Sequence, residues 1–355
     1  MKKKYLIFTC LFSLTLLFHA NKTLAQVLMN PEPENLGLVK WMTIEEADKK
    51  VKIAPKPLII DFYTDWCGWC KHMMKTTFSN PYLAEYINSN FYPVRFNAET
   101  TDTIEFLGYK YYNQGIGKRP PHDFAVKMLN GKMSYPSTVF MSNYQNNSFQ
   151  FSLLIPGYLD VPKIEPFLVF TVEYVFKTTQ AEEFADNYNL AFYDSIFAKV
   201  KKTKWLTMNQ AVDSNKVNKK KTIVFIHSNW CNSCKVMKQS TFENEVINKI
   251  VSKNYNMVDL NIESTDTINF MGQKFFNERT QEKPFHQFVY ALSQNGLTLP
   301  SMVIFNEQMQ VVNLVPYYMS PSITEAILEF FAKDAYKNTK WEDWQKTFVG
   351  KLPKK

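Results

Sequence analysis

The chain has 355 residues, of which 45% are hydrophobic and 21% are charged, and its formal net charge is +8. This length favours two domains of about 100–200 residues each, and the composition is typical of a globular protein with hydrophobic cores. Four lysines and no acidic residues lie in the first 25 positions, so the remainder carries only +4. A charge this small gives no support for a nucleic-acid partner.

The first 25 residues have the form of a secretory signal peptide. Three lysines at 2–4 precede an apolar run of 14 residues at 5–18, and small residues follow at 23–25. A membrane-spanning helix needs about 20 apolar residues, so the run is short for a span, with a retained membrane anchor as the alternative. The last residues, 351–355, are not an endoplasmic-reticulum retention signal. We therefore expect an exported protein, periplasmic or secreted, with no stable membrane insertion after cleavage.

The sequence then repeats itself with a period of 164 residues, so that 97–104 returns as 261–268. Later the offset falls to 160, and we place the four-residue loss in the turn near 143–148. A unit of this length is a duplicated domain and not a solenoid repeat. We predict the following division: a signal peptide at 1–25, a first domain at 26–190, a helical linker at 191–204 and a second domain at 205–355.

Within the first copy, apolar runs and helical spacings alternate. In chain order they predict a helix at 40–50, a buried strand at 58–63, a helix after Cys67, a helix at 82–87, a strand at 91–96, a β-hairpin at 103–112, a helix at 121–129, strands at 137–141 and 152–155, and a helix at 162–176. In the second copy, we expect the lysine run at 219–221 to be a solvated loop before a strand.

Four cysteines remain outside the predicted signal peptide, and they form two Cys-x-x-Cys pairs, Cys67 with Cys70 and Cys231 with Cys234. No cysteine therefore remains for a structural disulfide across a long loop. In each copy a strand precedes the pair and a helix follows it, so the first cysteine lies at a helix N-terminus. Unpaired N–H groups and the helix dipole there favour the reactive thiolate.

At this point the chain resembles the thioredoxin superfamily. Residues 60–71, with the sequence IDFYTDWCGWCK, are similar to the strand, active site and helix of that family, and residues 135–140, YPSTVF, are similar to its cis-proline loop. The resemblance covers roughly 41–176 and 205–336. It implies an α/β protein of two tandem thioredoxin-like domains, each a central mixed sheet flanked by helices with an inserted β-hairpin.

The resemblance also implies roles for the residues of the first copy. Cys67 would attack the substrate disulfide, Cys70 would resolve the mixed disulfide, and Asp61 would be a buried acid that exchanges a proton with Cys70. Arg95 replaces the lysine expected beside this acid, and its permanent charge is expected to hold Asp61 ionised more strongly than a lysine would. Pro136 would be cis and would present the preceding backbone to an extended substrate.

Further residues are expected to contact the substrate. In the first copy these are Trp66, Trp69 and Tyr135, and in the second copy they are Trp230 and Leu299, beside the equivalent proline Pro300. For Trp66 and Trp69, packing against the domain is the alternative. The predicted partners are protein thiols or disulfides together with an unidentified redox partner. The cysteines themselves are the redox centre, so the chemistry needs no dissociable cofactor.

The second copy differs at the acid. Phe225 replaces Asp61, and Asp259 replaces Arg95. Cys231 and Cys234 are therefore expected to be redox-active with different proton handling, and the domain is interpreted as impaired, as an electron relay, or as a substrate-binding module.

Two other classes of function remain open from the sequence. One is a copper- or zinc-binding module that uses the cysteines with His122 and its equivalent His286, although capping or packing is the simpler role for each histidine. The other is a non-catalytic polypeptide-binding protein. The direction of electron flow is not encoded in the motif, because similar motifs have reduction potentials from about −270 to about −120 mV.

Overall fold

The computed structural model describes residues 37–195, 202–293 and 296–353. The predicted signal peptide lies outside the described residues. In the part of the chain that is described, no helix is both long enough and apolar enough to cross a lipid bilayer.

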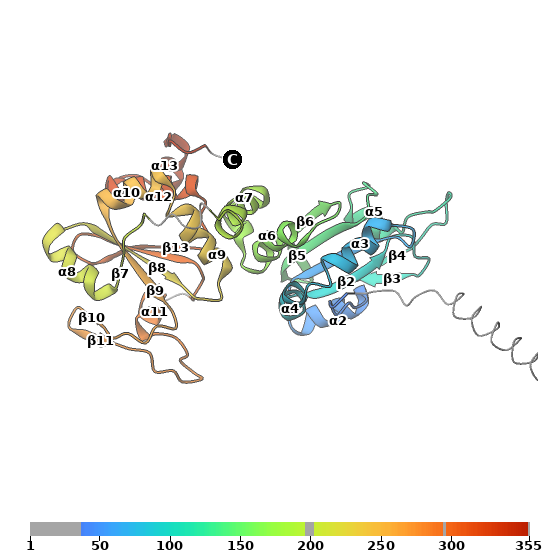
Figure 1. The fold of residues 1–355 in the computed structure, drawn as a ribbon, viewed down its shortest axis with the longest axis horizontal. Helices are drawn as coiled ribbons and strands as arrows, with labels where there is room; N and C mark the ends of the chain where they lie inside the picture. Colours follow the sequence, from blue (N-terminus) through green and yellow to red (C-terminus); the bar gives the residue numbers. More distant parts are fainter. Residues whose placement is uncertain (1–36, 196–201, 294–295, 354–355) are drawn as a thin grey trace, which may run out of the picture.

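The chain forms two α/β units, each built on a central mixed sheet with helices on both faces, as predicted (Figure 1). The first sheet has the strand order β2-β1-β5-β6. Its strands are β1 (Leu58–Tyr63), β2 (Tyr92–Asn97), β5 (Ser137–Gln145) and β6 (Ser148–Pro156). Strand β1 is parallel to β2 and antiparallel to β5, so the central strand is buried on both faces.

Alternating side chains of β1 point to two separate cores. Ile60 and Phe62 pack with the helices α2 (Ile44–Ile53) and α5 (Asp123–Met128). Ile59 packs on the opposite face, against three other helices. These are α3 (Gly68–Thr76), α4 (Pro81–Asn90) and α6 (Val161–Val172). This two-sided burial fixes the end of β1, and therefore the start of α3, where the first cysteine pair lies.

The second sheet has the order β13-β12-β8-β9-β7. Its strands are β7 (Trp205–Leu206), β8 (Lys221–His227), β9 (Tyr255–Asn261), β12 (Ser301–Phe305) and β13 (Val311–Pro316). The helices around it are α8 (Met208–Asn218), α9 (Asn232–Val236) with a π-helical turn at Met237–Thr241, α10 (Glu245–Asn254), α11 (Gln287–Leu292), α12 (Pro321–Ala332) and α13 (Trp341–Thr347), with a 3-10 turn at Ala335–Lys337.

The β-hairpin predicted at 103–112 is confirmed as β3 (Ile104–Phe106) and β4 (Tyr109–Tyr111), and its second copy is β10 (Ile268–Phe270) and β11 (Gln273–Phe275). The prediction of a wide turn at 143–148 is wrong. Strands β5 and β6 continue through most of it, with Gln145 paired to Ser148, so only Asn146 and Asn147 form the turn, both with positive φ. Strand β12 has 5 residues where β5 has 9, which agrees with a loss of residues at this hairpin.

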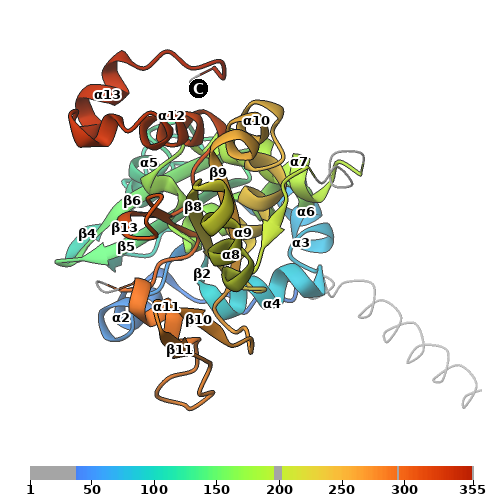
Figure 2. The same cartoon turned by 90° about the vertical axis from the view of Figure 1, so that its left-hand side faces the viewer.

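Helices α6 and α7 connect the two units. After α6, a 3-10 turn at Val175–Lys177 leads into α7 (Ala181–Phe192), and α7 packs on both α6 and α9. Figure 1 shows these helices between the two sheets, and Figure 2 shows the same fold turned by 90° about the vertical axis. Thr178 donates a hydrogen bond to the backbone carbonyl of Tyr318, and the Lys177 ammonium donates one to the Tyr317 hydroxyl at 2.8 Å. The two units therefore share a packed contact, while the exact domain limits remain a prediction.

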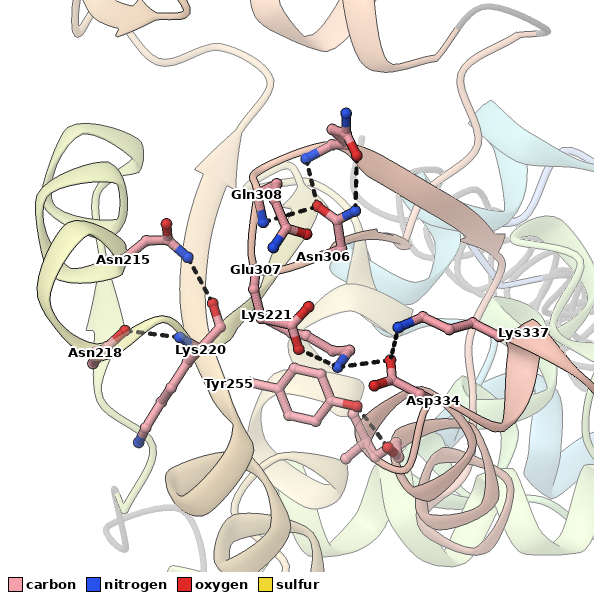
Figure 3. A network of polar contacts seen from close by, with 12 residues as sticks. Asn215, Asn218, Lys220, Lys221, Tyr255, Asn306, Glu307, Gln308, Asp334 and Lys337 are labelled. Atoms are coloured by element: carbon pink, nitrogen blue, oxygen red, sulfur yellow. Dashed lines mark hydrogen bonds and ion pairs between the residues drawn. The ribbon is translucent and has the colours of Figure 1, made fainter.

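The lysine run before β8 is not wholly solvated, contrary to the prediction. Lys221 lies in β8 and is 5% exposed. Its ammonium pairs with Glu307 at 2.5 Å and with Asp334 at 3.0 Å, and Lys337 pairs with the same aspartate at 3.3 Å (Figure 3). Two carboxylates compensate the buried charge, which explains how a lysine is tolerated in a central strand.

Candidate functional site

The first cysteine pair lies at the N-terminus of α3, shortly after the end of β1. Cys67 is the N-cap of α3, and its sulfur accepts the backbone N–H of Cys70 at 3.1 Å. The two residues form a disulfide with their Cα atoms 5.3 Å apart. The N-cap position gives the Cys67 sulfur the polar N–H groups of the first helical turn, which stabilise a thiolate after reduction.

Trp66 borders this pair and remains half exposed, at 52%. Its indole N–H donates to the carboxylate of Glu99 at 3.0 Å, and the Arg119 guanidinium lies over its ring at 4.9 Å. The ring of Tyr135 meets it edge-on, with centroids 6.1 Å apart. The structure therefore brings together two of the predicted substrate contacts, and Glu99 and Arg119 are neighbours that the motif alone did not reveal.

Trp69 lies between the two cysteines in sequence and is 62% exposed. Its ring contacts His72 at 5.5 Å and Tyr158 at 5.4 Å between centroids. We call Trp66, Trp69, His72, Tyr135 and Tyr158 the aromatic rim of the first site. Exposed aromatic rings beside a reactive disulfide provide apolar area for a polypeptide at a low cost in side-chain entropy.

The predicted cis-proline loops are present in both copies. The peptide bonds Tyr135–Pro136 and Leu299–Pro300 are both cis. Pro136 immediately precedes β5, whose antiparallel partner β1 leads to Cys67. The contact between Tyr135 and Trp66 shows that this loop approaches the cysteine loop in the first domain.

Asp61 lies in the middle of β1 and is 1% exposed. Burial raises the pKa of its carboxyl to about 7, and the attraction of Arg95 only partly opposes this. The Arg95 Nε atom is 3.9 Å from the carboxylate, and its guanidinium lies 3.8 Å from the ring centre of Tyr63. Arg95 therefore favours the ionised form of Asp61, in the expected direction, but desolvation outweighs a contact this long.

The second cysteine pair repeats the local geometry. Cys231 is the N-cap of α9, its sulfur accepts the Cys234 N–H at 3.1 Å, and the two form a disulfide. Trp230 is 59% exposed, and its equivalent in the first copy, Trp66, is 52% exposed. Ser233, however, takes the place of Trp69 and is fully buried, so the rim of the second site is closed where that of the first is open.

The acid of the second copy is in a different electrostatic state. Phe225 fills the position of Asp61 in the core and pairs in register with Asp259 on β9. Partial burial would raise the pKa of Asp259, but His227 at 2.5 Å and the Lys238 ammonium at 2.6 Å hold it below its usual range. Asp259 is therefore a fixed carboxylate and not a group that titrates near neutral pH.

Glu173 is a residue of the second site that the sequence reasoning missed. It follows α6 of the first unit, yet its carboxylate accepts the backbone N–H groups of Asn232 at 3.0 Å and Ser233 at 2.7 Å. The nearer oxygen lies 3.6 Å from the sulfur of Cys231. A signal existed in the repeat, because the offset of 160 aligns Glu173 with Lys333, a reversal of charge.

The two equivalent histidines cap helices, in agreement with the simpler interpretation. The His122 Nδ1 atom accepts the Phe124 N–H at 3.1 Å, and His286 does the same for Phe288. Both histidines are fully buried, and the other ring nitrogen lies 2.9 Å from a backbone carbonyl. Among the residues that the structure describes, no three His, Cys, Asp or Glu side chains form a group able to hold a metal ion.

Two family models match the chain. A model described as "Thioredoxin-like domain" matches residues 44–170, and one described as "Thioredoxin-like" matches residues 204–292. Together the two matches cover more than half of the chain, and each one contains one Cys-x-x-Cys pair.

Curated relatives match over a short segment. The chain is 36% identical over 56 residues to "Thiol:disulfide interchange protein DsbD" of Salmonella typhi, which is 16% of this chain and 10% of that protein. A protein of the same name from Vibrio vulnificus is also 36% identical over 56 residues, with 15% and 9% covered. The chain thus spans about a tenth of the length of the curated relatives it matches.

Among solved structures, a thioredoxin-fold protein from Helicobacter pylori aligns with 45% of this chain and 88% of its own, at 19% identity and a TM-score of 0.29. A thioredoxin from Thermus thermophilus aligns with 39% of this chain and 90% of its own, at 11% identity and a TM-score of 0.28. The two family matches, the two mixed sheets and the two cysteine pairs at helix N-termini lead to one conclusion: this chain belongs to the thioredoxin superfamily, with two thioredoxin-like domains in tandem.

Proposed function

We propose that the protein is an exported thiol–disulfide oxidoreductase that exchanges dithiol and disulfide with protein substrates, chiefly through Cys67 and Cys70. The observation that carries the proposal is the position of Cys67, which caps α3 beside the half-exposed Trp66 and Trp69. A thiolate that is stabilised by helix N–H groups and flanked by exposed aromatic rings is suited to attack a disulfide within a polypeptide.

The reaction proceeds in two exchanges. The Cys67 thiolate attacks one sulfur of a substrate disulfide, forming a mixed disulfide and releasing the other substrate sulfur as a thiolate. Cys70 then loses its proton to Asp61 and attacks the Cys67 sulfur. The second substrate sulfur leaves and takes up the proton held by Asp61, and the first takes a proton from solvent. The Cys67–Cys70 disulfide re-forms, and two electrons have passed to the substrate. A donor dithiol, the unidentified redox partner, returns the pair to its reduced form, and the reverse sequence oxidises a substrate.

The pKa of Asp61 supports its part in this sequence. A carboxyl with a pKa of about 7 accepts and returns a proton near neutral pH, whereas an ordinary aspartate would remain ionised. The cis prolines Pro136 and Pro300, with the preceding Tyr135 and Leu299, are proposed to position an extended substrate beside each pair. The form of residues 1–25 supports a periplasmic or secreted location.

The test is the reduction potential of each pair, measured in glutathione buffers on the full chain. The double variant Cys231→Ser/Cys234→Ser isolates the first pair, and Cys67→Ser/Cys70→Ser isolates the second. A first-pair value near −250 mV or lower indicates a reductase, and one of about −180 to −120 mV indicates an oxidase or isomerase. If the first pair does not equilibrate with glutathione and the chain does not reduce insulin disulfides, the proposal is wrong.

A further inference from the structure

Both cysteine pairs are almost fully buried, but the second pair lies against helices that belong to the first unit. Helices α6 and α7, which follow the first sheet, both contact α9. Cys231 and Cys234 belong to a core cluster that also holds Val169 of α6 and Phe184 of α7. The first unit thus supplies part of the surroundings of the second redox pair.

Glu173 makes a direct polar contact across this boundary. It is the C-cap of α6, and its two carboxylate oxygens accept the N–H groups of Asn232 and Ser233, the first two residues of α9. One oxygen is 3.6 Å from the Cys231 sulfur. Among the described residues, no acidic side chain accepts the corresponding N–H groups of Gly68 and Trp69 in the first site.

The position of Glu173 is unfavourable within its own helix. The C-terminal end of a helix carries partial negative charge, which disfavours an acid and favours a base. The second copy follows this rule, since Lys333 caps α12 and pairs with Glu329 at 2.8 Å. The N–H groups of α9 stabilise the negative charge of Glu173, which the C-terminal end of α6 does not. The contact with the second site therefore explains why an acid is found at this position.

The titratable groups that face Glu173 come from three helices. Lys235 on α9 stabilises its charge, while Tyr86 on α4 and Tyr188 on α7 have their own pKa values raised by burial and by this acid. Although part of the Glu173 residue remains accessible, loss of hydration raises the pKa of its carboxyl, and the hydrogen bonds from Ser233 and Asn232 oppose that rise.

We propose that Glu173 is a positioning residue of the second redox site, contributed by the first domain, which disfavours the Cys231 thiolate while the two domains are in contact. Its carboxylate occupies two N–H groups that would otherwise stabilise the thiolate, and it places a negative charge beside the sulfur. The pair at Cys231 is then less reactive than the pair at Cys67, and its reactivity depends on the contact between domains. The proposal rests on the proposed function only in treating Cys231–Cys234 as a pair that can be reduced.

The test is the pH profile of alkylation on the fully reduced full-length chain. The rate of modification by iodoacetamide is followed between pH 5 and 10, and peptide mass spectrometry resolves each of the four cysteines. We expect Glu173→Gln to lower the apparent pKa of Cys231 by at least about one unit, which is a tenfold rise in thiolate fraction at neutral pH. Because a less basic thiolate is also a weaker nucleophile, the expected rate increase at pH 7 is about threefold.

Two variants and one internal standard make the result specific. Glu173→Ala, which removes the carboxylate without leaving an amide, should shift the profile in the same direction. Glu165→Gln, on the same helix and in contact with Tyr188 and Tyr193, should leave it unchanged. Cys67 in the same samples should keep its own profile.

An unchanged or higher Cys231 pKa in both Glu173 variants would overturn the proposal, as would slower alkylation at pH 7. Alkylation requires no protein substrate, so this outcome is separate from a failure of glutathione equilibration or insulin reduction at Cys67. Circular dichroism of each variant establishes that the fold is retained, and the pH profile is a readout that a purely structural role of Glu173 would not move.

Discussion

Asp61 and Phe225 lie at equivalent register positions of the two sheets. Asp61 pairs with Arg95 across β1 and β2, and Phe225 pairs with Asp259 across β8 and β9. The acid thus lies on the central strand in one domain and on its neighbour in the other. Burial gives Asp61 a pKa of about 7, whereas ion pairing holds the pKa of Asp259 low. Asp61, unlike Asp259, therefore has a pKa suited to proton exchange near neutral pH.

The raised pKa of Asp61 gives stability a defined pH dependence. The carboxyl has an ordinary pKa of 3.8 and a folded value of about 7, so the folded state holds the proton more tightly. Stability is therefore lost as pH rises between these values. Relative to the wild type, the free energy of unfolding of Asp61→Asn should rise by about 1.4 kcal/mol for each pH unit in this interval.

Urea unfolding at pH 4, 5.5, 7 and 8 measures this difference, with Asp65→Asn, at an exposed position, as the control. A difference between variant and wild type that does not change with pH contradicts the prediction.

The same substitution should slow the second exchange of the reaction. Without a carboxylate to accept its proton, Cys70 attacks the mixed disulfide less readily, and we expect turnover at pH 7 to fall by about 10- to 100-fold. Formation of the mixed disulfide at Cys67 should be little affected, so this intermediate should accumulate. Acid quenching followed by mass spectrometry detects it. Equal amounts of mixed disulfide in Asp61→Asn and wild type would show that Asp61 does not act in resolution.

Local patterns in the sequence predicted the parts of the structure that depend on local chemistry. The cysteines at helix N-termini and the inserted hairpins follow from patterns within a few residues of one another, whereas the cis-proline loops were expected from the resemblance to the thioredoxin superfamily. The extent of β5 and β6 was underestimated, because Asn143 and Asn147 are typical of turns, yet pairing with the partner strand continues past Asn143.

The features that the sequence did not predict depend on contacts between distant segments. Glu173 reaches Asn232 across 59 positions, and Lys221 finds Glu307 across 86, so neither partner is visible in a local window. The balance between burial and Arg95 at Asp61 also depends on the observed distance of 3.9 Å, since a closer guanidinium would oppose the effect of burial more strongly.

Trp69 should contribute to substrate affinity and little to stability, because 62% of it is exposed beside the Cys67–Cys70 pair. We expect Trp69→Ala to raise the KM for a peptide disulfide by about tenfold with little change in kcat, which is the effect of losing an aromatic anchor at an interface. Steady-state kinetics on a disulfide-containing peptide measure both constants. Trp230→Ala, which removes a similarly exposed tryptophan at the second site (the equivalent of Trp66), is the control, and a loss confined to kcat would exclude a role of Trp69 in binding.

Lys221 should be important for the stability of the second domain, since its buried ammonium is shared by Glu307 and Asp334 (Figure 3). Burial alone would raise the pKa of each acid, and their pairs with Lys221 help to hold both values below the usual range. Lys221→Ala leaves two neighbouring carboxylates without this cation, and because both acids are partly exposed we expect a loss of about 1–3 kcal/mol. Urea unfolding measures the loss against Lys220→Ala, whose ammonium contacts only a backbone carbonyl of Ser252 among the described residues. If the two variants unfold at the same urea concentration, the buried ion pairs do not contribute to stability.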